Sequence, residues 1–133
     1  MWKILVVDDN AANREFLIEL LREYAVCDIA INGREAFEIY KDSVIDNKPY
    51  DMMLLDIEMP EVDGLTVLSL VRAIEASAGV VPGEGLPIII VTAFEEPFKK
   101  AFDLGCDDYM LKPVASDQLI QKIKMKLAGK NKA

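Results

Sequence analysis

Residues 52–60 constrain the fold of this chain more than any other stretch. They place an apolar run, 52–55, directly before Asp56, with Pro49 upstream and Pro60 downstream. The run is too short for a typical helix and is typical of a strand buried on both faces, as in a parallel sheet. Ligands of such sheets bind beyond the carboxyl ends of the strands. The position of Asp56 therefore predicts a functional site at that end.

Further apolar runs alternate with segments of helical periodicity along the whole chain. The predicted strands are residues 3–7, 26–31, 52–55, 86–91 and 109–111. The predicted helices are 11–24 after the cap Asn10, 36–40 fading into a polar segment 41–48, 64–78, 97–104 ending at Gly105, and 116–127 capped by Ser116. The Gly- and Pro-rich segment 79–87 is predicted to be a loop.

This alternation of strands and helices predicts one α/β fold. Five strands joined by right-handed crossovers form a doubly wound parallel sheet with five flanking helices. Reactive side chains follow every strand except the second, which fits the strand order 2-1-3-4-5 with the second strand at an edge.

Composition limits the function classes that remain. The 133 residues suit a single domain, residues 1–129, followed by a short basic tail, 130–133. A net charge of −8 argues against direct nucleic-acid binding, and the absence of a long apolar run predicts a cytoplasmic protein without membrane contact. The chain has no histidine and two distant cysteines, which excludes zinc clusters and His-based triads.

The polar residues at the strand ends indicate one kind of chemistry. Asp8 and Asp9 follow the first strand, Asp56 the third, Thr92 the fourth and Lys112 the fifth. Three converging carboxylates need either raised pKa values or a compensating cation, of which a divalent metal is the simpler answer, and an oxygen-only site favours Mg²⁺. A metal, an ammonium and a hydroxyl can stabilise a phosphoryl group, and an aspartate is a competent nucleophile for it. These residues predict phosphorylation of an aspartate.

Four motifs carry a family resemblance. They are Ile4-Leu5-Val6-Val7-Asp8-Asp9, the segment from Leu54 to Gly64, Val91-Thr92-Ala93 and the segment from Gly105 to Pro113. In this order and spacing the chain resembles a response-regulator receiver domain of two-component phosphorelay signalling, with a flavodoxin-like, CheY-like fold. That resemblance carries the same strand order.

The resemblance implies a role for each matching residue. Asp56 is the phosphoacceptor, and Asp9, Asp56 and the backbone carbonyl of Glu58 bind Mg²⁺, with Asp8 contacting a metal-bound water. Lys112 binds a phosphoryl oxygen and precedes a cis proline.

The resemblance also implies a switch. Thr92 moves toward the phosphoryl group and Tyr109 rotates inward, which reshapes the surface of the fourth helix, fifth strand and fifth helix. The donor is a sensor histidine kinase or a histidine phosphotransfer protein. The chain is then no enzyme beyond its own phosphorylation and dephosphorylation, and its effector and any phosphorylation-dependent homodimer stay open.

Two other functions remain as alternatives. A haloacid dehalogenase-like Mg²⁺ phosphohydrolase also uses an aspartyl nucleophile, but its usual Asp-x-Asp pattern is absent because Glu58 follows Asp56. A pseudo-receiver that acts only as an interaction module would not need Asp9, Asp56, Thr92 and Lys112. Glu58 and Phe94 depart from the commonest receiver pattern and are expected to affect the lifetime of the phosphoryl group.

Overall fold

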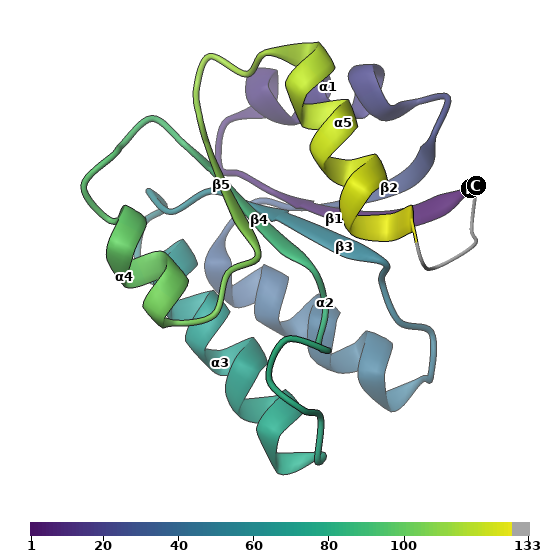
Figure 1. Cartoon of the computed structure of the whole chain (residues 1–133), viewed down its shortest axis with the longest axis vertical. Helices are drawn as coiled ribbons and strands as arrows, with labels where there is room; N and C mark the ends of the chain where they lie inside the picture. Colours follow the sequence, from purple (N-terminus) through teal and green to yellow (C-terminus); the bar gives the residue numbers. More distant parts are fainter. Residues whose placement is uncertain (129–133) are drawn as a thin grey trace.

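A five-stranded parallel sheet lies between two layers of helices in the computed structural model, which describes residues 1–128 (Figure 1). The strand order is β2-β1-β3-β4-β5. The elements are β1 (Trp2–Val7), α1 (Ala11–Leu21), β2 (Ala25–Ala30), α2 (Gly33–Ile45), β3 (Met52–Leu55), α3 (Gly64–Ser77), β4 (Ile88–Thr92), α4 (Phe98–Asp103), β5 (Asp108–Leu111) and α5 (Ser116–Leu127). The predicted fold class and strand order are confirmed.

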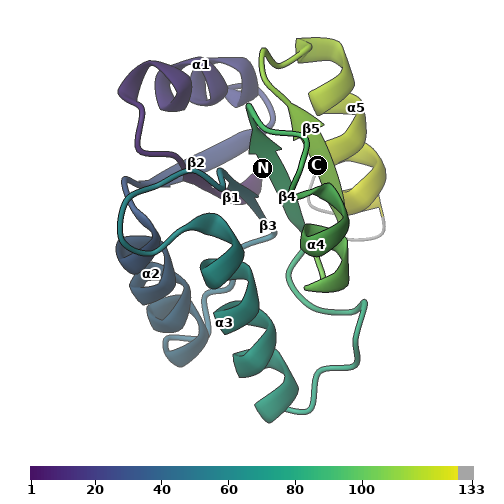
Figure 2. The same ribbon diagram turned by 90° about the vertical axis from the view of Figure 1, so that its left-hand side faces the viewer.

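The helices cover both faces of the sheet. Helices α1 and α5 lie on one face, and α2, α3 and α4 lie on the other (Figures 1 and 2). Alternate residues of β1 point into the two layers, so Ile4 and Val6 belong to one core and Leu5 and Val7 to the other. Strands β3 and β4 are buried along their whole length, as expected for central strands of a parallel sheet.

The strand register brings the carboxyl ends together. Val7 of β1 is paired with Leu55 of β3, and the Asp56 amide donates to the Val7 carbonyl at 3.0 Å. On the other side, Leu55 is paired with Ile90 of β4, and Thr92 is paired with Leu111 of β5. The residues that follow β1, β3 and β5 therefore meet at one edge of the sheet.

Several predicted boundaries are wrong, and the structure explains two of them. Helix α2 does not fade after residue 40 but continues to Ile45, because its buried face, which carries Ala36 and Tyr40, extends to Ser43. Strand β4 begins at Ile88 rather than at residue 86, because the Leu86 amide donates to the Glu75 carboxylate at 2.6 Å. A polar side chain can thus remove a residue from a strand.

The first and last helices also differ from the prediction. Helix α1 ends at Leu21, before Tyr24, while Asn10 caps it as expected. Ser116 is the first helical residue of α5 and does not cap it, since Ala115 occupies the cap position without a side-chain hydrogen bond. Strand β2 lies one residue earlier than predicted.

Two further local predictions, the end of α3 and the conformation of Gly105, are confirmed. Helix α3 ends at its cap Ala78, and Gly105, after α4, has a φ of 105° in the left-handed region. The two cysteines are free. None of the helices described within residues 1–128 is long and apolar enough to cross a membrane. The predicted basic tail, 130–133, lies outside the described residues.

Candidate functional site

The predicted site residues gather at the carboxyl edge of the sheet, where they come from β1, β3, β4 and β5. Asp8 follows β1 and is 2% exposed, and Asp56 follows β3 and is 6% exposed. Thr92 ends β4 and is fully buried. Asp9 is exposed. Buried carboxylates are rare in proteins unless they are paired with a cation or bind a metal. Two buried carboxylates at this edge therefore indicate a functional site rather than an ordinary part of the core.

Three carboxylates form a group with the geometry of a metal site. Asp8, Asp9 and Asp56 each offer an oxygen, and these oxygens lie within 4.8 Å of one another. Their ligand atoms are hard oxygens without nitrogen or sulfur, which suits Mg²⁺. The exposed position of Asp9 leaves this side of the group accessible to solvent. The residues therefore fit a partly hydrated divalent cation.

Lys112 places a positive charge among these carboxylates. Its Nζ donates to Asp8 Oδ2 at 2.7 Å and to Asp56 Oδ2 at 3.2 Å, so one ammonium bridges two buried carboxylates. The peptide bond that precedes Pro113 is cis, as the resemblance implied. The Lys112 amide donates to the Thr92 carbonyl at 2.8 Å, which fixes its backbone beside β4.

The electrostatics of the pair follow from burial and from the surplus of acid. Burial raises the pKa of Asp56, the Lys112 charge opposes this, and the Asp8 charge adds to it, with a raised pKa as the net result. Burial lowers the pKa of Lys112, but its hydrogen bond to Asp8 and the charges of Asp56 and Asp8 outweigh that effect and raise it. Lys112 is thus held in its charged form, while Asp56 lacks full compensation.

Glu58 lies at the rim of this group. Its side chain is exposed, and its backbone amide faces Asp56 Oδ1 at 3.4 Å, which is long for a hydrogen bond. The side chain of Glu58 forms no hydrogen bond to Asp8, Asp9 or Asp56 within the described residues. Its predicted contribution through the backbone carbonyl stays a prediction.

Thr92 and Tyr109 are linked through Phe94. The Thr92 hydroxyl faces the Phe94 amide at 3.4 Å, and the Tyr109 hydroxyl donates to the Phe94 carbonyl. Tyr109 is 8% exposed, and its ring packs edge-on against Phe98 with a centroid distance of 5.2 Å. The Tyr109 ring therefore already faces the protein interior in this structure. Thr92 makes no hydrogen bond to Asp56 among the residues described here.

Two residues support the site in ways that the sequence did not predict. Arg14 donates from its guanidinium to the Asp8 carbonyl at 2.8 Å, and no local pattern in α1 indicates that contact. Gly64 approaches the Asp56 backbone so closely that a β-carbon there would lie 2.1 Å from the Asp56 carbonyl oxygen. In the sequence this glycine only marks the end of a family motif and the start of a helix, and the close packing that requires a glycine there is visible only in the structure.

Comparison with known proteins finds relatives of one kind. The model of the response regulator receiver domain matches residues 4–124. The probable transcriptional regulatory protein SilR of Salmonella typhimurium is 31% identical over 132 residues, covering 97% of this chain and 52% of SilR. DltR of Streptococcus agalactiae is 36% identical over 128 residues, covering 93% of this chain and 51% of DltR. Hybrid signal transduction histidine kinase G of Dictyostelium discoideum is 35% identical over 117 residues, covering 84% of this chain and 3% of the kinase.

The chain thus spans about half, or far less, of the length of these relatives.

Solved structures agree with the sequence match. The receiver domain of Francisella response regulator 1452 superposes with a TM-score of 0.77 at 26% identity, covering 98% of this chain and all of that one. The receiver domain of sensor histidine kinase PA1611 from Pseudomonas aeruginosa, which has a magnesium ion coordinated in its active-site cleft, gives a TM-score of 0.77 at 25% identity, covering 96% and 98%. On the sequence match, the fold and these likenesses, the chain belongs to the response regulator receiver domain family.

Proposed function

We propose that this chain accepts a phosphoryl group on Asp56, from a phosphohistidine of a sensor histidine kinase or a histidine phosphotransfer protein, with Mg²⁺ bound. Receiver domains are signalling modules rather than classical enzymes, so the chemistry is limited to the chain's own phosphorylation and dephosphorylation. The observation that carries the proposal is the bridge from Lys112 to Asp8 and Asp56, at 2.7 and 3.2 Å, beside the exposed Asp9.

The residues have complementary roles in the transfer. A carboxylate oxygen of Asp56 attacks the phosphorus, the bond from phosphorus to the histidine nitrogen breaks, and its electron pair stays on the imidazole. Lys112 is within reach of an oxygen on Asp56 and stabilises the negative charge of the transferred group. The Thr92 hydroxyl is proposed to turn from the Phe94 amide toward the same group.

Asp9, Asp56 and the Glu58 carbonyl would hold the ion, with Asp8 bound to one of its waters. When bound, Mg²⁺ supplies positive charge that neutralises the phosphoryl oxygens. The group of three carboxylates with oxygens within 4.8 Å supports this assignment. One lysine cannot balance three carboxylates, so the chain's own charges leave room for a divalent cation.

The proposed switch runs from Thr92 to the surface formed by α4, β5 and α5. Tyr109 is already inward, with its hydroxyl bonded to the Phe94 carbonyl. Phosphorylation is therefore proposed to stabilise an arrangement that the unmodified chain already samples, rather than to create a new one. Exposed Phe98 and Leu111 border this surface and would contact an effector or a second copy.

The relatives bear on the wider role. SilR and DltR are transcriptional regulatory proteins and kinase G is a hybrid histidine kinase, so the partner that delivers the phosphoryl group is proposed to be of the histidine kinase class. The net charge of −8 argues against direct nucleic-acid binding by this domain. A cytoplasmic setting is proposed because such phosphoryl donors act there.

Incubation with acetyl phosphate and Mg²⁺ tests this function. Intact-mass spectrometry is expected to find one phosphoryl adduct per chain that persists long enough to isolate and that disappears without Mg²⁺. Rapid release of many equivalents of inorganic phosphate would instead indicate a phosphohydrolase. The absence of any adduct from a folded chain would indicate an interaction module, and both results would overturn the proposal.

A further inference from the structure

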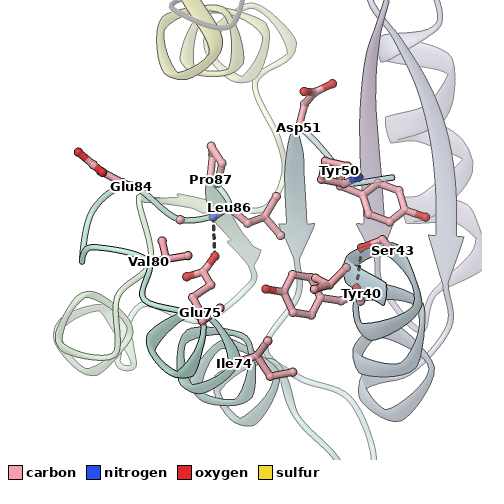
Figure 3. A pocket seen from close by; sticks show the side chains of 14 residues that line it. Tyr40, Ser43, Tyr50, Asp51, Ile74, Glu75, Val80, Glu84, Leu86 and Pro87 are labelled. Carbon is pink, nitrogen blue, oxygen red and sulfur yellow. Dashed lines mark hydrogen bonds between the residues drawn. The ribbon is translucent and has the colours of Figure 1, made fainter. Parts of the chain in front are cut away.

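A pocket of about 420 Å³ lies beside the residues that precede β3 and β4, at the opposite end of these strands from Asp56. Figure 3 shows its lining. Its walls come from α2, α3, the segments before β3 and β4, and the loop of residues 79–87. Ile74, Val80 and Leu86 provide apolar surface. The volume lies within the range typical of small-molecule pockets, about 300–1,000 Å³. None of the residues proposed for phosphoryl transfer lines it.

The pocket contains a tyrosine hydroxyl that lacks a hydrogen-bond partner within the chain. Tyr40 is 6% exposed as a residue, and its hydroxyl points across the pocket toward Glu75 (Figure 3). Within the described residues this hydroxyl makes no hydrogen bond, although the carbonyl of the same residue accepts from Ser43. The hydroxyl oxygen is not among the fully buried polar atoms without a partner, so it is open to the pocket and available to a bound molecule.

The charge around this hydroxyl is negative. Glu75 accepts from Arg72 at 2.7 Å, and the same guanidinium is shared with Asp107 at 3.0 Å, so two carboxylates face one cation. Burial raises the pKa of Tyr40, and the Glu75 charge raises it more than the Arg72 charge lowers it. This field disfavours an anion and favours a group with N–H donors and positive charge.

The loop of residues 79–87 builds the outer wall of the pocket. Gly79 and Gly83 have φ values of 82° and 91°, which other residues rarely adopt. A β-carbon on Gly85 would lie 2.1 Å from the Glu75 carboxylate, and the Leu86 amide donates to that carboxylate at 2.6 Å. Glycine at these positions thus lets the loop close against α3. The loop has no proposed role in phosphoryl transfer, and its structural role is to form this wall of the pocket.

We propose that the pocket between α2, α3 and the 79–87 loop binds a small organic amine with an aromatic or branched aliphatic body. The ammonium donates to the Tyr40 hydroxyl and faces the Glu75 carboxylate. The apolar body contacts Ile74, Val80 and Leu86. This site goes beyond the phosphoryl-transfer function and does not depend on it.

Two probes of matched size and opposite charge test the proposal. Phenethylamine and 3-phenylpropionate are titrated into the ¹⁵N-labelled chain, and amide shifts are followed by NMR. Phenethylamine is expected to shift the amides of Val80, Gly85 and Leu86 saturably. The carboxylate probe is expected to bind at least about tenfold more weakly, because like charges are opposed in the pocket.

Variants separate the pocket from general surface binding. Tyr40→Phe keeps the ring and is expected to weaken phenethylamine binding about fivefold, as for loss of one hydrogen bond. Val80→Phe fills the pocket from its partly exposed edge and is expected to abolish saturable shifts. Tyr24→Phe, on the other side of the sheet, is the matched control and is expected to leave the affinity unchanged.

Three results would overturn the proposal. They are the absence of saturable shifts in the folded wild-type chain, equal binding of both probes, and unchanged phenethylamine affinity in Tyr40→Phe and Val80→Phe. Each would leave the acetyl phosphate reaction at Asp56 unaffected, so failure here is distinguishable from failure of the phosphoryl-transfer function. Backbone amide spectra of each variant establish that it is folded before its affinity is compared.

Discussion

The sheet carries a cluster of charged side chains at each end. The carboxyl-end cluster consists of Asp8, Asp9, Asp56 and Lys112, in which one ammonium bridges two buried carboxylates and Asp9 stays exposed. The amino-end cluster consists of Arg72, Glu75 and Asp107, in which one guanidinium joins two carboxylates. Both clusters have more acid than base, yet their hydrogen bonding differs.

The amino-end cluster is closed by backbone groups. Glu75 also accepts from the Leu86 amide at 2.6 Å, Asp107 accepts from the Ile88 amide at 2.8 Å, and the third donor of Arg72 binds the Gly105 carbonyl. At the carboxyl end, Asp8 also accepts from a backbone amide, that of Asn10, at 2.9 Å. The remaining oxygen of Asp56, however, has within residues 1–128 only the 3.4 Å contact with the Glu58 amide.

This difference distinguishes Asp56, the proposed phosphoacceptor, from Glu75 and Asp107. Carboxylates that accept from backbone amides fasten loops to the sheet, as Glu75 and Asp107 do beside β4. A carboxylate that is buried, incompletely bonded and of raised pKa remains available for a cation or a phosphoryl group. The predictions below alter each cluster in turn.

The largest expected effect is the loss of the phosphoryl adduct in Asp56→Asn. The amide keeps the size of the side chain but cannot act as the nucleophile, so incubation with acetyl phosphate and Mg²⁺ should give no adduct. The free energy of unfolding should not fall, because burial disfavours the charge that the substitution removes. A marked loss of stability in urea would place Asp56 among the structural carboxylates instead.

Lys112→Ala should slow phosphorylation by acetyl phosphate by about 100-fold, the typical cost of removing one donor to a developing negative charge. The adduct is measured over time by intact mass at a temperature where circular dichroism shows a folded chain. Lys122→Ala, which removes a partly exposed ion pair with Asp108, is the matched control. Equal rates for both variants would remove Lys112 from the reaction.

Arg72→Met should lower the free energy of unfolding by about 2 kcal/mol, because it leaves two partly buried carboxylates without their cation. Urea denaturation measures this loss. The phosphorylation rate of the folded variant should match that of the wild type, since the amino-end cluster takes no part in the transfer. A slower reaction at full folding would show that the two clusters are coupled.

The raised pKa of Asp56 should appear in the pH dependence of stability without Mg²⁺. Above the ordinary value of 3.8, the folded state retains a proton that the unfolded state has lost. Stability from this group is therefore lost as pH rises toward the folded pKa. Relative to Asp56→Asn, the wild type should become less stable through that window and then level off. A constant difference from pH 3.8 upward would contradict the raised pKa.

The smallest expected effect concerns the lifetime of the adduct. Glu58→Ala should change the autodephosphorylation rate with Mg²⁺ present. A base that acts directly typically contributes about 100-fold to a rate, and the change should be smaller than this because Glu58 is exposed. The isolated adduct is followed by mass over time, with the exposed Glu38→Ala as control. An unchanged half-life would remove Glu58 from the mechanism.

The contrast between the clusters also shows how far the sequence alone could lead. Short apolar runs that end in Asp8, Asp56 and Lys112 predicted both the sheet and the edge where these residues meet, because strand ends of a parallel sheet coincide. The amino-end cluster was not predicted. Arg72 and Asp107 lie 35 residues apart, and Glu75 belongs to a helix whose periodicity does not reveal a backbone amide as its partner.

Misplaced boundaries have the same origin. The periodicity of apolar residues gave the type of every element but could not show that the buried face of α2 extends to Ser43, or that the Leu86 amide binds Glu75 instead of joining β4. A hydrogen bond from a different element decides the second of these boundaries. The family resemblance added roles to the site residues, and all of those roles remain proposals.

Chemical location of the phosphoryl group tests the central claim most directly. The adduct formed with acetyl phosphate and Mg²⁺ is reduced with borohydride, which converts an acyl phosphate of aspartate to homoserine, and the digested chain is sequenced by mass spectrometry. The account predicts homoserine at position 56 alone. Homoserine at position 8 or 9, or an unmodified Asp56 in a folded chain that carries an adduct, would contradict it.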